Sequence, residues 1–546
     1  MTPKPVHPAA CDRRIFLWSL SSALAGFLFG FDTVVISGAE KTIQELWDLD
    51  GTRHGWAMSA ALWGTVLGSL FGGWPADRFG RKGTLLWIGI LYFVSALWSG
   101  LSQDLWGFIS ARFVGGLGVG ISTVVGPMYI SEIAPAAKRG RLAGMFQFNI
   151  VFGILVAFLS NWILGRSMGE LAWRWMLAVE AIPAVVYTVM CFGIPESPRW
   201  LITKKRDRER GKAVLGMARP DATPEQLEAL AVEIETHSGK EPASRGIPFR
   251  RLRIPLLLAF LVAFFNQLSG INVILYFAPR LLGLAGIDNP LQASIWLGVV
   301  NLAFTFVGLW LIDRLGRRTL LFIGSIGYIL SLGICAWAFL SFPGFKVVSA
   351  AIDYQGAAEK VEKLERAERT VTGAEKQSAA AALEDSRKAL VAASAAAKYE
   401  GEAIGIPEGA STTEAKTVAG RAKEEASRGL GGLSTLVLVC LLGFIAAHAV
   451  GQGAVIWVFI SEIFPNAFRA LGQSFGCATH WVFAALLAQW FPVAIGHFDA
   501  GYIFAFFAFM MVLQLLWVLG MVPETKGVTL EEMEERLGVA GPRAGA

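Results

Sequence analysis

The stretch DRFGRKGTLL at residues 77–86 has a second copy in the same chain, DRLGRRTLL at residues 313–321. In each copy a short basic turn joins two long apolar runs, a pattern typical of two membrane helices connected by a tight hairpin. Two further pairs of segments match: ISEIAP at 130–135 with ISEIFP at 460–465, and Pro-Glu-Ser at 195–197 with Pro-Glu-Thr at 523–525. We therefore interpret the chain as an internal duplication.

The composition indicates a protein that is embedded in a membrane. Of 546 residues, 54% are hydrophobic and 17% are charged, and the mean hydropathy is +0.51. These are too few polar residues to cover a soluble globule of this size. Apolar runs long enough to cross a hydrocarbon core of about 30 Å begin near Ile15, Trp56, Thr84, Leu105, Leu142, Trp173, Pro255, Leu291, Thr319, Leu433, Leu471 and Gly501. We predict an all-α polytopic membrane protein with twelve transmembrane helices, six in each copy.

Positive charge is concentrated in alternate loops, and this sets the expected orientation. The net charge is +5, and the basic clusters lie at 4–14, 77–82, 138–141, 199–253, 313–318 and around Arg469. By the positive-inside rule, these loops and both termini are cytoplasmic. Charge arranged in this way does not indicate a nucleic-acid partner. The sequence has no Asn-x-Ser/Thr acceptor, which favours a bacterial inner (plasma) membrane over a glycosylating route.

The spacing of the copies reveals a large insert. Asp313 follows Asp77 by 236 residues, whereas Glu462 follows Glu132 by 330. The Ala-, Glu- and Lys-rich insert should lie on the extracytoplasmic side, and its periodicity predicts one or two soluble helices. The predicted parts are a cytoplasmic N-tail at 1–14, a six-helix bundle at 15–195, a cytoplasmic helical linker at 196–253, a second six-helix bundle at 254–522, the insert at 342–432 within that bundle, and a cytoplasmic C-tail at 523–546.

Asp32 is an acidic residue in the middle of the first apolar run. A carboxylate is costly at that depth unless it is paired or protonated, which makes it a candidate functional group. Its expected partner is Arg112 in the fourth run, and a purely structural ion pair is the alternative. The corresponding positions in the other copy are Asn272 and Leu442. Since a structural requirement would be expected in both copies, we favour a functional role.

The duplicated hairpins also carry charges that can pair with acids at other helix ends. Glu132 and Glu462 each end a helix shortly before an arginine, and we expect Arg81 and its copy to pair with them. Such ion pairs would hold the two halves together on the cytoplasmic side in one conformation and break in another. The alternative is that these basic residues only set topology. The residues that we assign to gating are Asp77, Arg78, Arg81, Glu132, Arg139, Glu196, Arg199, Asp313, Arg314, Arg317, Glu462 and Arg469.

Amide side chains recur on several apolar runs, at Gln147, Asn149, Asn266, Gln267, Asn272 and Asn301. A single amide in a membrane usually joins two helices. Several on different helices suit a ligand covered in hydroxyl groups, because amides both donate and accept hydrogen bonds. Trp457, His480 and Trp481 add aromatic faces, although a tryptophan is more often an interfacial anchor and a lone histidine more often a core residue.

In combination these segments resemble the sugar porters of the major facilitator superfamily. The motifs that carry the resemblance are GFLFGFD at 26–32, the two basic hairpins, the glycine-rich fourth run after Arg112, PMYISEIAPAAKRG at 127–140, PESPRWL at 195–201, QLSGIN at 267–272, SEIFP at 461–465 and PETKG at 523–527. They cover nearly everything except the tails and the insert. The resemblance implies the major facilitator fold, in which two six-helix bundles expose a central monosaccharide site alternately to each side.

The resemblance also implies roles for individual residues. Asp32 matches the proton-coupling acid of bacterial sugar–proton symporters, with Arg112 as its partner and Glu180 as an accessory, whereas facilitative glucose transporters carry Asn in place of Asp32. The residues implied to line the sugar are Phe29, Gln147, Asn266, Gln267, Asn272, Asn301, Gly453, Trp457, His480 and Trp481.

Several positions depart from the family pattern. Asn266 precedes Gln267 where two glutamines are usual, Ala454 replaces a proline, and His480 replaces an amide. Ile154 matches glucose facilitators rather than the bacterial xylose symporter, which favours a hexose.

We predict proton-coupled monosaccharide import, with glucose as the first candidate, by a monomer in the lipid bilayer. The alternatives are a facilitative sugar uniporter with a static Asp32 pair, and a sugar sensor whose insert contacts an extracytoplasmic partner. A drug exporter fits the amides less well. We predict no enzyme, cofactor or metal site, because no nucleophile–base set, metal-binding cluster or phosphate loop appears in the sequence.

Overall fold

The computed structural model describes residues 8–135, 138–219, 221–238, 249–366, 373–397, 409–465 and 468–539, and these contain helices but no strand. The first bundle consists of α1 (Pro8–Leu46), α2 (Gly51–Phe71), α4 (Arg81–Leu101), α5 (Leu105–Ile133), α6 (Arg139–Ser167), and α7 (Ala172–Ala178) continued by α8 (Ala181–Phe192). A short helix, α3 (Gly73–Phe79), and a 3-10 turn, η2 (Gly169–Leu171), complete it.

The second bundle repeats this plan with more interruptions. It consists of α12 (Phe249–Leu268), α13 (Ile271–Tyr276), α14 (Ala278–Leu284), α15 (Pro290–Leu315), α16 (Arg317–Ser341), α20 (Gly432–Val450), α21 (Gln452–Ile463), α22 (Arg469–His497) and α23 (Ala500–Gly520). Gly270, with φ +86°, separates α12 from α13 in a left-handed conformation that favours glycine. Gly451 separates α20 from α21. Both breaks lie next to residues that were predicted to bind sugar.

Eleven helical segments in the described part are long and apolar enough to cross a membrane. The twelfth bundle helix is α2, which has 21 residues and is largely buried. It contains Arg53, His54 and several Gly and Ser residues, which lower its hydropathy. These small residues let it approach its neighbours, because a Cβ added to Gly55 would lie 1.9 Å from the carbonyl oxygen of Gln489 in α22.

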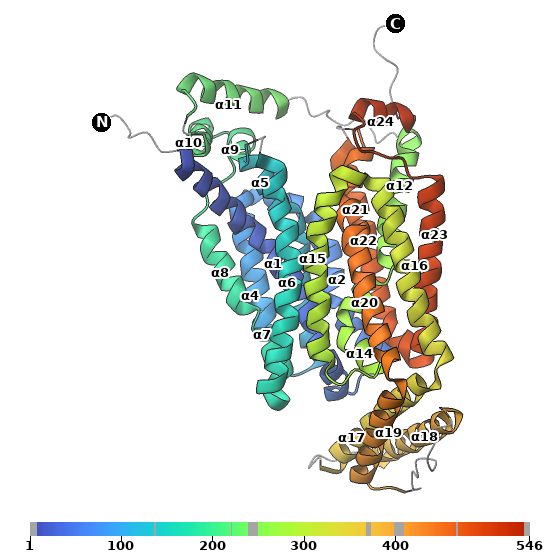
Figure 1. Ribbon diagram of the computed structural model, residues 1–546. Helices are drawn as coiled ribbons and strands as arrows, with labels where there is room; N and C mark the ends of the chain where they lie inside the picture. Colours follow the sequence, from blue (N-terminus) through green and yellow to red (C-terminus); the bar gives the residue numbers. More distant parts are fainter. Residues whose placement is uncertain are drawn as a thin grey trace.

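Two groups of helices outside the bundles lie at opposite ends of them (Figure 1). One end, which we call the linker face, carries α9 (Pro198–Thr203), α10 (Arg208–Ala218), α11 (Pro224–Ser238) and α24 (Leu530–Arg536). The other end, the insert face, carries α17 (Pro343–Arg366), α18 (Gly373–Ala397) and α19 (Thr412–Leu430). The prediction of one or two helices in the insert was therefore wrong, because three are formed.

Small side chains explain how the insert packs. On α19 the buried positions are Ala415, Ala419, Ala422, Ala426 and Leu430, a spacing of three to four residues that forms one face of a helix. This face packs on α17, which also contacts α18. Ser411 and Glu414 form a reciprocal capping box at the start of α19. The polar sequence therefore still builds a compact three-helix unit.

Candidate functional site

Asp32 and Arg112 form a buried ion pair inside the first bundle. The Nη1 atom of Arg112 lies 2.6 Å from Oδ1 of Asp32, and its Nη2 atom lies 3.3 Å from Oδ2. The same Nη2 also donates to the backbone carbonyl oxygen of Asp32, at 3.1 Å. Both residues are 2% exposed. Gly115 of α5 lets α4 approach beside the pair, because an added Cβ would lie 2.4 Å from the hydroxyl oxygen of Ser95.

Three further buried residues surround this pair. Glu180, at the start of α8, is 1% exposed, interacts electrostatically with both members, and has no hydrogen-bond partner for Oε1 among the described residues. Tyr92 of the first bundle and Tyr276 of the second interact electrostatically with the pair as well. Glu180 was predicted from the resemblance, whereas both tyrosines were missed, because their only signal in the sequence is a phenol group within an apolar run.

Three of the predicted amides of the second bundle form one hydrogen-bonded cluster at the break between α12 and α13. Gln267 accepts from the side-chain nitrogen of Asn272 at 2.8 Å and donates to the side-chain oxygen of Asn266 at 3.1 Å. Its amide nitrogen also lies 3.0 and 3.1 Å from the two ring nitrogens of His480. Gln267 is therefore the centre of the cluster, and His480 takes the place of an amide within it.

Aromatic rings enclose this amide cluster and reach the other bundle. The ring of His480 lies 5.2 Å from that of Trp457 and 4.8 Å from that of Trp481, measured between centroids. The ring of Trp481 lies 5.5 Å from that of Phe29. Phe29 belongs to α1, three residues before Asp32. One helix of the first bundle thus touches the aromatic cluster and also carries the buried acid.

The other predicted sugar residues are placed on neighbouring elements. Gln147 is half-buried on α6, and Asn301 is buried on α15. Gly453 is half-buried on α21, where an added Cβ would lie 3.3 Å from the ring of His448. His448 in turn lies 2.7 Å from the hydroxyl of Tyr328. His448 and Tyr328 were missed because each stands alone within an apolar run.

The duplicated hairpins form duplicated charge networks on the linker face. In the first bundle, Arg81 donates to both carboxylate oxygens of Glu132 at 2.9 Å, and its backbone N–H donates to Glu196 at 2.8 Å. Asp77 accepts from Arg81 at 3.1 Å. Gly80 has φ +85°, and a Cβ there would lie 2.2 Å from Glu196, so the position requires glycine.

The second bundle repeats these contacts. Arg317 donates to Glu462 at 2.7 and 3.0 Å, and its backbone N–H donates to Glu524 at 2.9 Å. Asp313 accepts from Arg317 at 3.5 Å. The predicted pairing of hairpin arginines with Glu132 and Glu462 is present. The expectation that these ion pairs join the two halves is not met in this structure, since each lies inside one bundle.

The remaining gating candidates make fewer contacts. Arg78 and Arg199 are exposed, Arg314 lies over the ring of Trp310 at 3.9 Å, and Arg469 buries an Nε atom that has no hydrogen-bond partner among the described residues. The side chain of Arg139 lies outside the described part of the structure.

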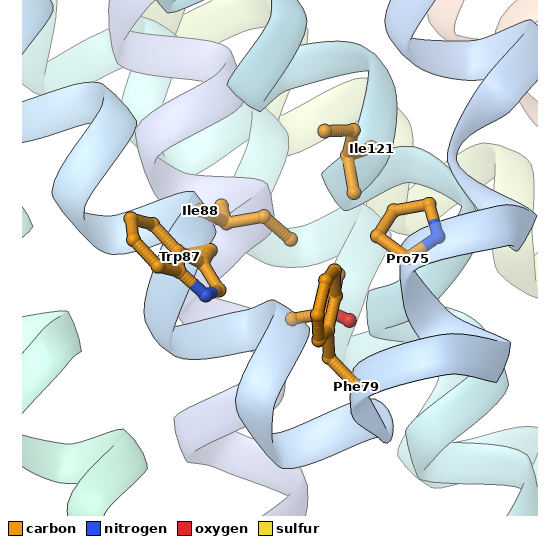
Figure 2. Close-up of a pocket in the computed structure, with 6 residues that line it drawn as sticks. Pro75, Phe79, Trp87, Ile88 and Ile121 are labelled. Atoms are coloured by element: carbon orange, nitrogen blue, oxygen red, sulfur yellow. The ribbon is translucent and has the colours of Figure 1, made fainter.

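Two apolar cavities lie away from the amide cluster. One, of about 270 Å³, is lined by Pro75, Phe79, Thr84, Trp87, Ile88 and Ile121, and Figure 2 shows five of these side chains labelled around one space beside α3, α4 and α5. The other, of about 490 Å³, lies beside α22 and α23. Neither offers the polar groups that a sugar requires. Within the described ranges, no group of three or more His, Cys, Asp or Glu side chains could hold a metal ion.

Comparison with known proteins gives a consistent match. The family model described as sugar (and other) transporter matches residues 18–352 and 414–537. A glucose transport protein of Synechocystis is 30% identical, over 97% of this chain and 99% of that protein. The D-xylose-proton symporter of Escherichia coli K12 is 28% identical, over 95% of each chain. The arabinose-proton symporter of Bacillus subtilis is 29% identical, over 95% of this chain and 94% of that protein.

Solved structures agree with this match. The inward-open conformation of the xylose transporter XylE from Escherichia coli superposes with a TM-score of 0.70, at 26% identity, over 96% of this chain and 99% of that one. A partially occluded inward-open conformation of the same transporter gives 0.67.

Proposed function

The chain belongs to the sugar (and other) transporter family within the major facilitator fold, and from this premise we propose that it imports a monosaccharide together with protons by alternating access. Glucose is the first candidate substrate. In this proposal the linker face, which bears the basic loops, lies on the cytoplasmic side of the inner membrane. The insert lies on the outer side.

The observation that carries the proposal is that α1 carries the buried acid and also touches the aromatic rings beside the amide cluster. Asp32 is paired with Arg112, and Phe29, about one turn away on the same helix, contacts Trp481 beside His480 and Gln267. A change in the charge of Asp32 can therefore alter α1 where it meets the sugar site. A uniporter needs a sugar site but has no need of a buried titratable acid on a helix that touches that site.

The proposed cycle follows from the cost of buried charge. A proton arriving from outside neutralises Asp32, which removes both its attraction to Arg112 and its desolvation cost. Sugar then binds the amide cluster, the outer side closes, and the inner side opens. After sugar release the proton leaves to the cytoplasm and the ion pair forms again. Coupling supplies about 1.4 kcal/mol per unit of pH difference and about 2.3 kcal/mol per 100 mV.

The proposed substrate class rests on the hydrogen-bonding capacity of the cluster. Gln267, Asn266 and Asn272 together offer donors and acceptors of neutral character, which match hydroxyl groups. Trp457 and Trp481 supply flat apolar faces for a sugar ring. Glucose is favoured by Ile154, which is buried on α6, and by the relative named as a glucose transport protein. The relatives named for xylose and arabinose make these pentoses the next sugars to test.

Uptake of labelled glucose into proteoliposomes tests the proposal. Wild type should accumulate glucose when an inward proton gradient is imposed, whereas Asp32→Asn should lose accumulation and keep equilibrative exchange. Asp104→Asn is the matched control, because Asp104 only caps α5 at the surface and Asn is an equally good cap. Equal equilibrating flux in wild type and Asp32→Asn would instead indicate a uniporter. No flux with glucose, xylose or arabinose would favour the sugar sensor.

A further inference from the structure

A second group of charges joins the two bundles near the insert face. Arg280 of α14 forms an ion pair with Glu40 of α1, at 2.7 Å between Nη2 and Oε1. Arg280 also donates to Gln44, which lies on α1 like Glu40. His54 of α2 lies 3.3 Å from the same oxygen of Glu40, and both side chains are at most 2% exposed. Arg280 comes from the second bundle and the other three residues from the first, so this ion pair crosses the interface.

The insert helix α17 is fixed to the second bundle at its beginning. It follows α16 after the single residue Phe342. Lys346 pairs with Asp499, at 3.0 Å, just before α23. Phe345 is 2% exposed, and its ring lies 4.6 Å from that of Phe339 in α16. The beginning of the insert is therefore attached to the second bundle.

The other end of α17 reaches the first bundle. Lys360 pairs with Asp48 at 2.6 Å. Lys363 donates to the backbone carbonyl oxygens of Glu45 and Leu46, at 3.3 and 3.4 Å. These carbonyls belong to the last turn of α1, where they lack partners within the helix and attract cations. A single helix thus bridges both bundles on the insert face.

This bridge is an addition to the plan that the family shares. The family model leaves out residues 353–413, which include Lys360 and Lys363. The added segment is braced from within, because Glu362 pairs with Lys416 of α19 and with Arg366 of α17. A braced helix keeps both lysines directed at the end of α1.

We propose that Lys360 and Lys363 of the insert, with Asp48 and the Glu40–Arg280 pair, form a gate that holds the two bundles together on the insert face. The gate must open before the sugar site can be reached from that side. The inference rests on the proposed function in assuming that the bundles move against each other. The gate would change the balance between the two conformations, and it contributes no residue to the proposed sugar site.

The size of the effect follows from exposure. Lys360 and Asp48 are 42% and 72% exposed in their side chains, and exposed pairs of this kind contribute little each. Replacing both lysines should raise the population open on the insert face about two- to fivefold. Glu40→Gln removes a buried partner of Arg280 and should shift the population further.

Pulsed electron paramagnetic resonance on the full chain tests the gate without any sugar. Spin labels at Arg53→Cys on α2 and Asp288→Cys before α15 would report the separation of the bundles, in a background without the five native cysteines. Lys360→Ala with Lys363→Ala should increase the longer distances. The control Lys388→Ala removes a lysine that pairs at 3.8 Å with Glu384 on the same helix of the insert, and it should leave the distances unchanged.

Charge exchange separates the specific pair from general damage. Lys360→Asp alone should open the insert face, and adding Asp48→Lys should close it again. Unchanged distances in the double lysine variant, or no rescue by the exchange, would overturn the proposal. The distances are measured in the absence of transport. If the distances change in the double lysine variant but no sugar is transported by the wild type, the proposed function alone is contradicted. If proton-driven uptake is present but the distances do not change, the gate alone is contradicted.

Discussion

The guanidinium of Arg112 contacts the carboxylate of Asp32 at 2.6 Å and 3.3 Å inside the first bundle. Removing one partner of such a pair leaves an uncompensated buried charge. We expect Arg112→Met to lower the stability by about 3–5 kcal/mol and Arg112→Met with Asp32→Asn to recover most of the loss. Thermal unfolding in detergent would measure both, with exposed Arg53→Met as the control. An Arg112→Met protein as stable as wild type would contradict this expectation.

The turn at Gly80 gives a second prediction. Gly80→Ala places a methyl group 2.2 Å from Glu196 at φ +85°, so we expect a loss of about 1–3 kcal/mol and reduced uptake. Gly83→Ala is a close control, since its added Cβ meets Phe79 at an ordinary 3.6 Å. If both variants unfolded at the wild-type temperature, the contacts between the hairpin and Glu196 would not matter for stability.

Gln267 is the residue whose loss should most affect sugar binding. It contacts Asn266, Asn272 and His480, so Gln267→Ala removes one proposed partner of the sugar and leaves others unpaired. We expect the KM for glucose to rise at least about tenfold, corresponding to about 1.4 kcal/mol. Initial rates of uptake would measure this change. Gln103→Ala, in the loop before α5, should leave KM unaltered, and an unaltered KM in Gln267→Ala would place the sugar elsewhere.

The insert should respond to acid in a defined direction. The hydrogen bond from Lys416, aided by Arg366, lowers the pKa of Glu362 below its usual 4.5. A carboxyl with a lowered pKa stabilises the fold above its unfolded pKa, and this contribution is lost as the pH falls through the folded value. Spin labels at Glu365→Cys and Gly420→Cys should therefore keep a narrow distance distribution from pH 7 to 5 and broaden only in stronger acid.

The variant Glu362→Gln provides the control for this acid response. It lacks the titrating carboxylate, so its distance distribution should already be broader at pH 7 than that of wild type. A wild-type distribution that broadens between pH 7 and 5, or a Glu362→Gln distribution as narrow as wild type, would contradict the assignment.

The repeated and charged features were the ones that the sequence could predict. The copies at Gly80 and Gly316 and the pairing of Arg81 with Glu132 follow from matching motifs, because closely similar sequences in two places fold alike. The pairing of Asp32 with Arg112 follows from the cost of isolated charge in a membrane. Whether a hairpin arginine pairs inside its own bundle or across the interface depends on how the two bundles pack, and no motif in the sequence specifies that packing.

Other features depend on contacts between distant segments that carry no motif. Tyr276 comes close to Arg112 only because α13 of the second bundle packs against α1. Arg280 meets Glu40 across the same interface. The third insert helix was missed because alanine faces predict a helix without indicating how many partners it packs against. His480 was predicted to line the sugar by the resemblance. Its contact with Gln267, which lies just before the helix break at Gly270, was seen only in the structure.

The single residue between α16 and α17 makes the insert a lever arm. With 24 residues at 1.5 Å each, α17 is about 36 Å long. A rotation of the second bundle by about 10° would therefore displace the far end of α17 by about 6 Å, several times the movement near the pivot.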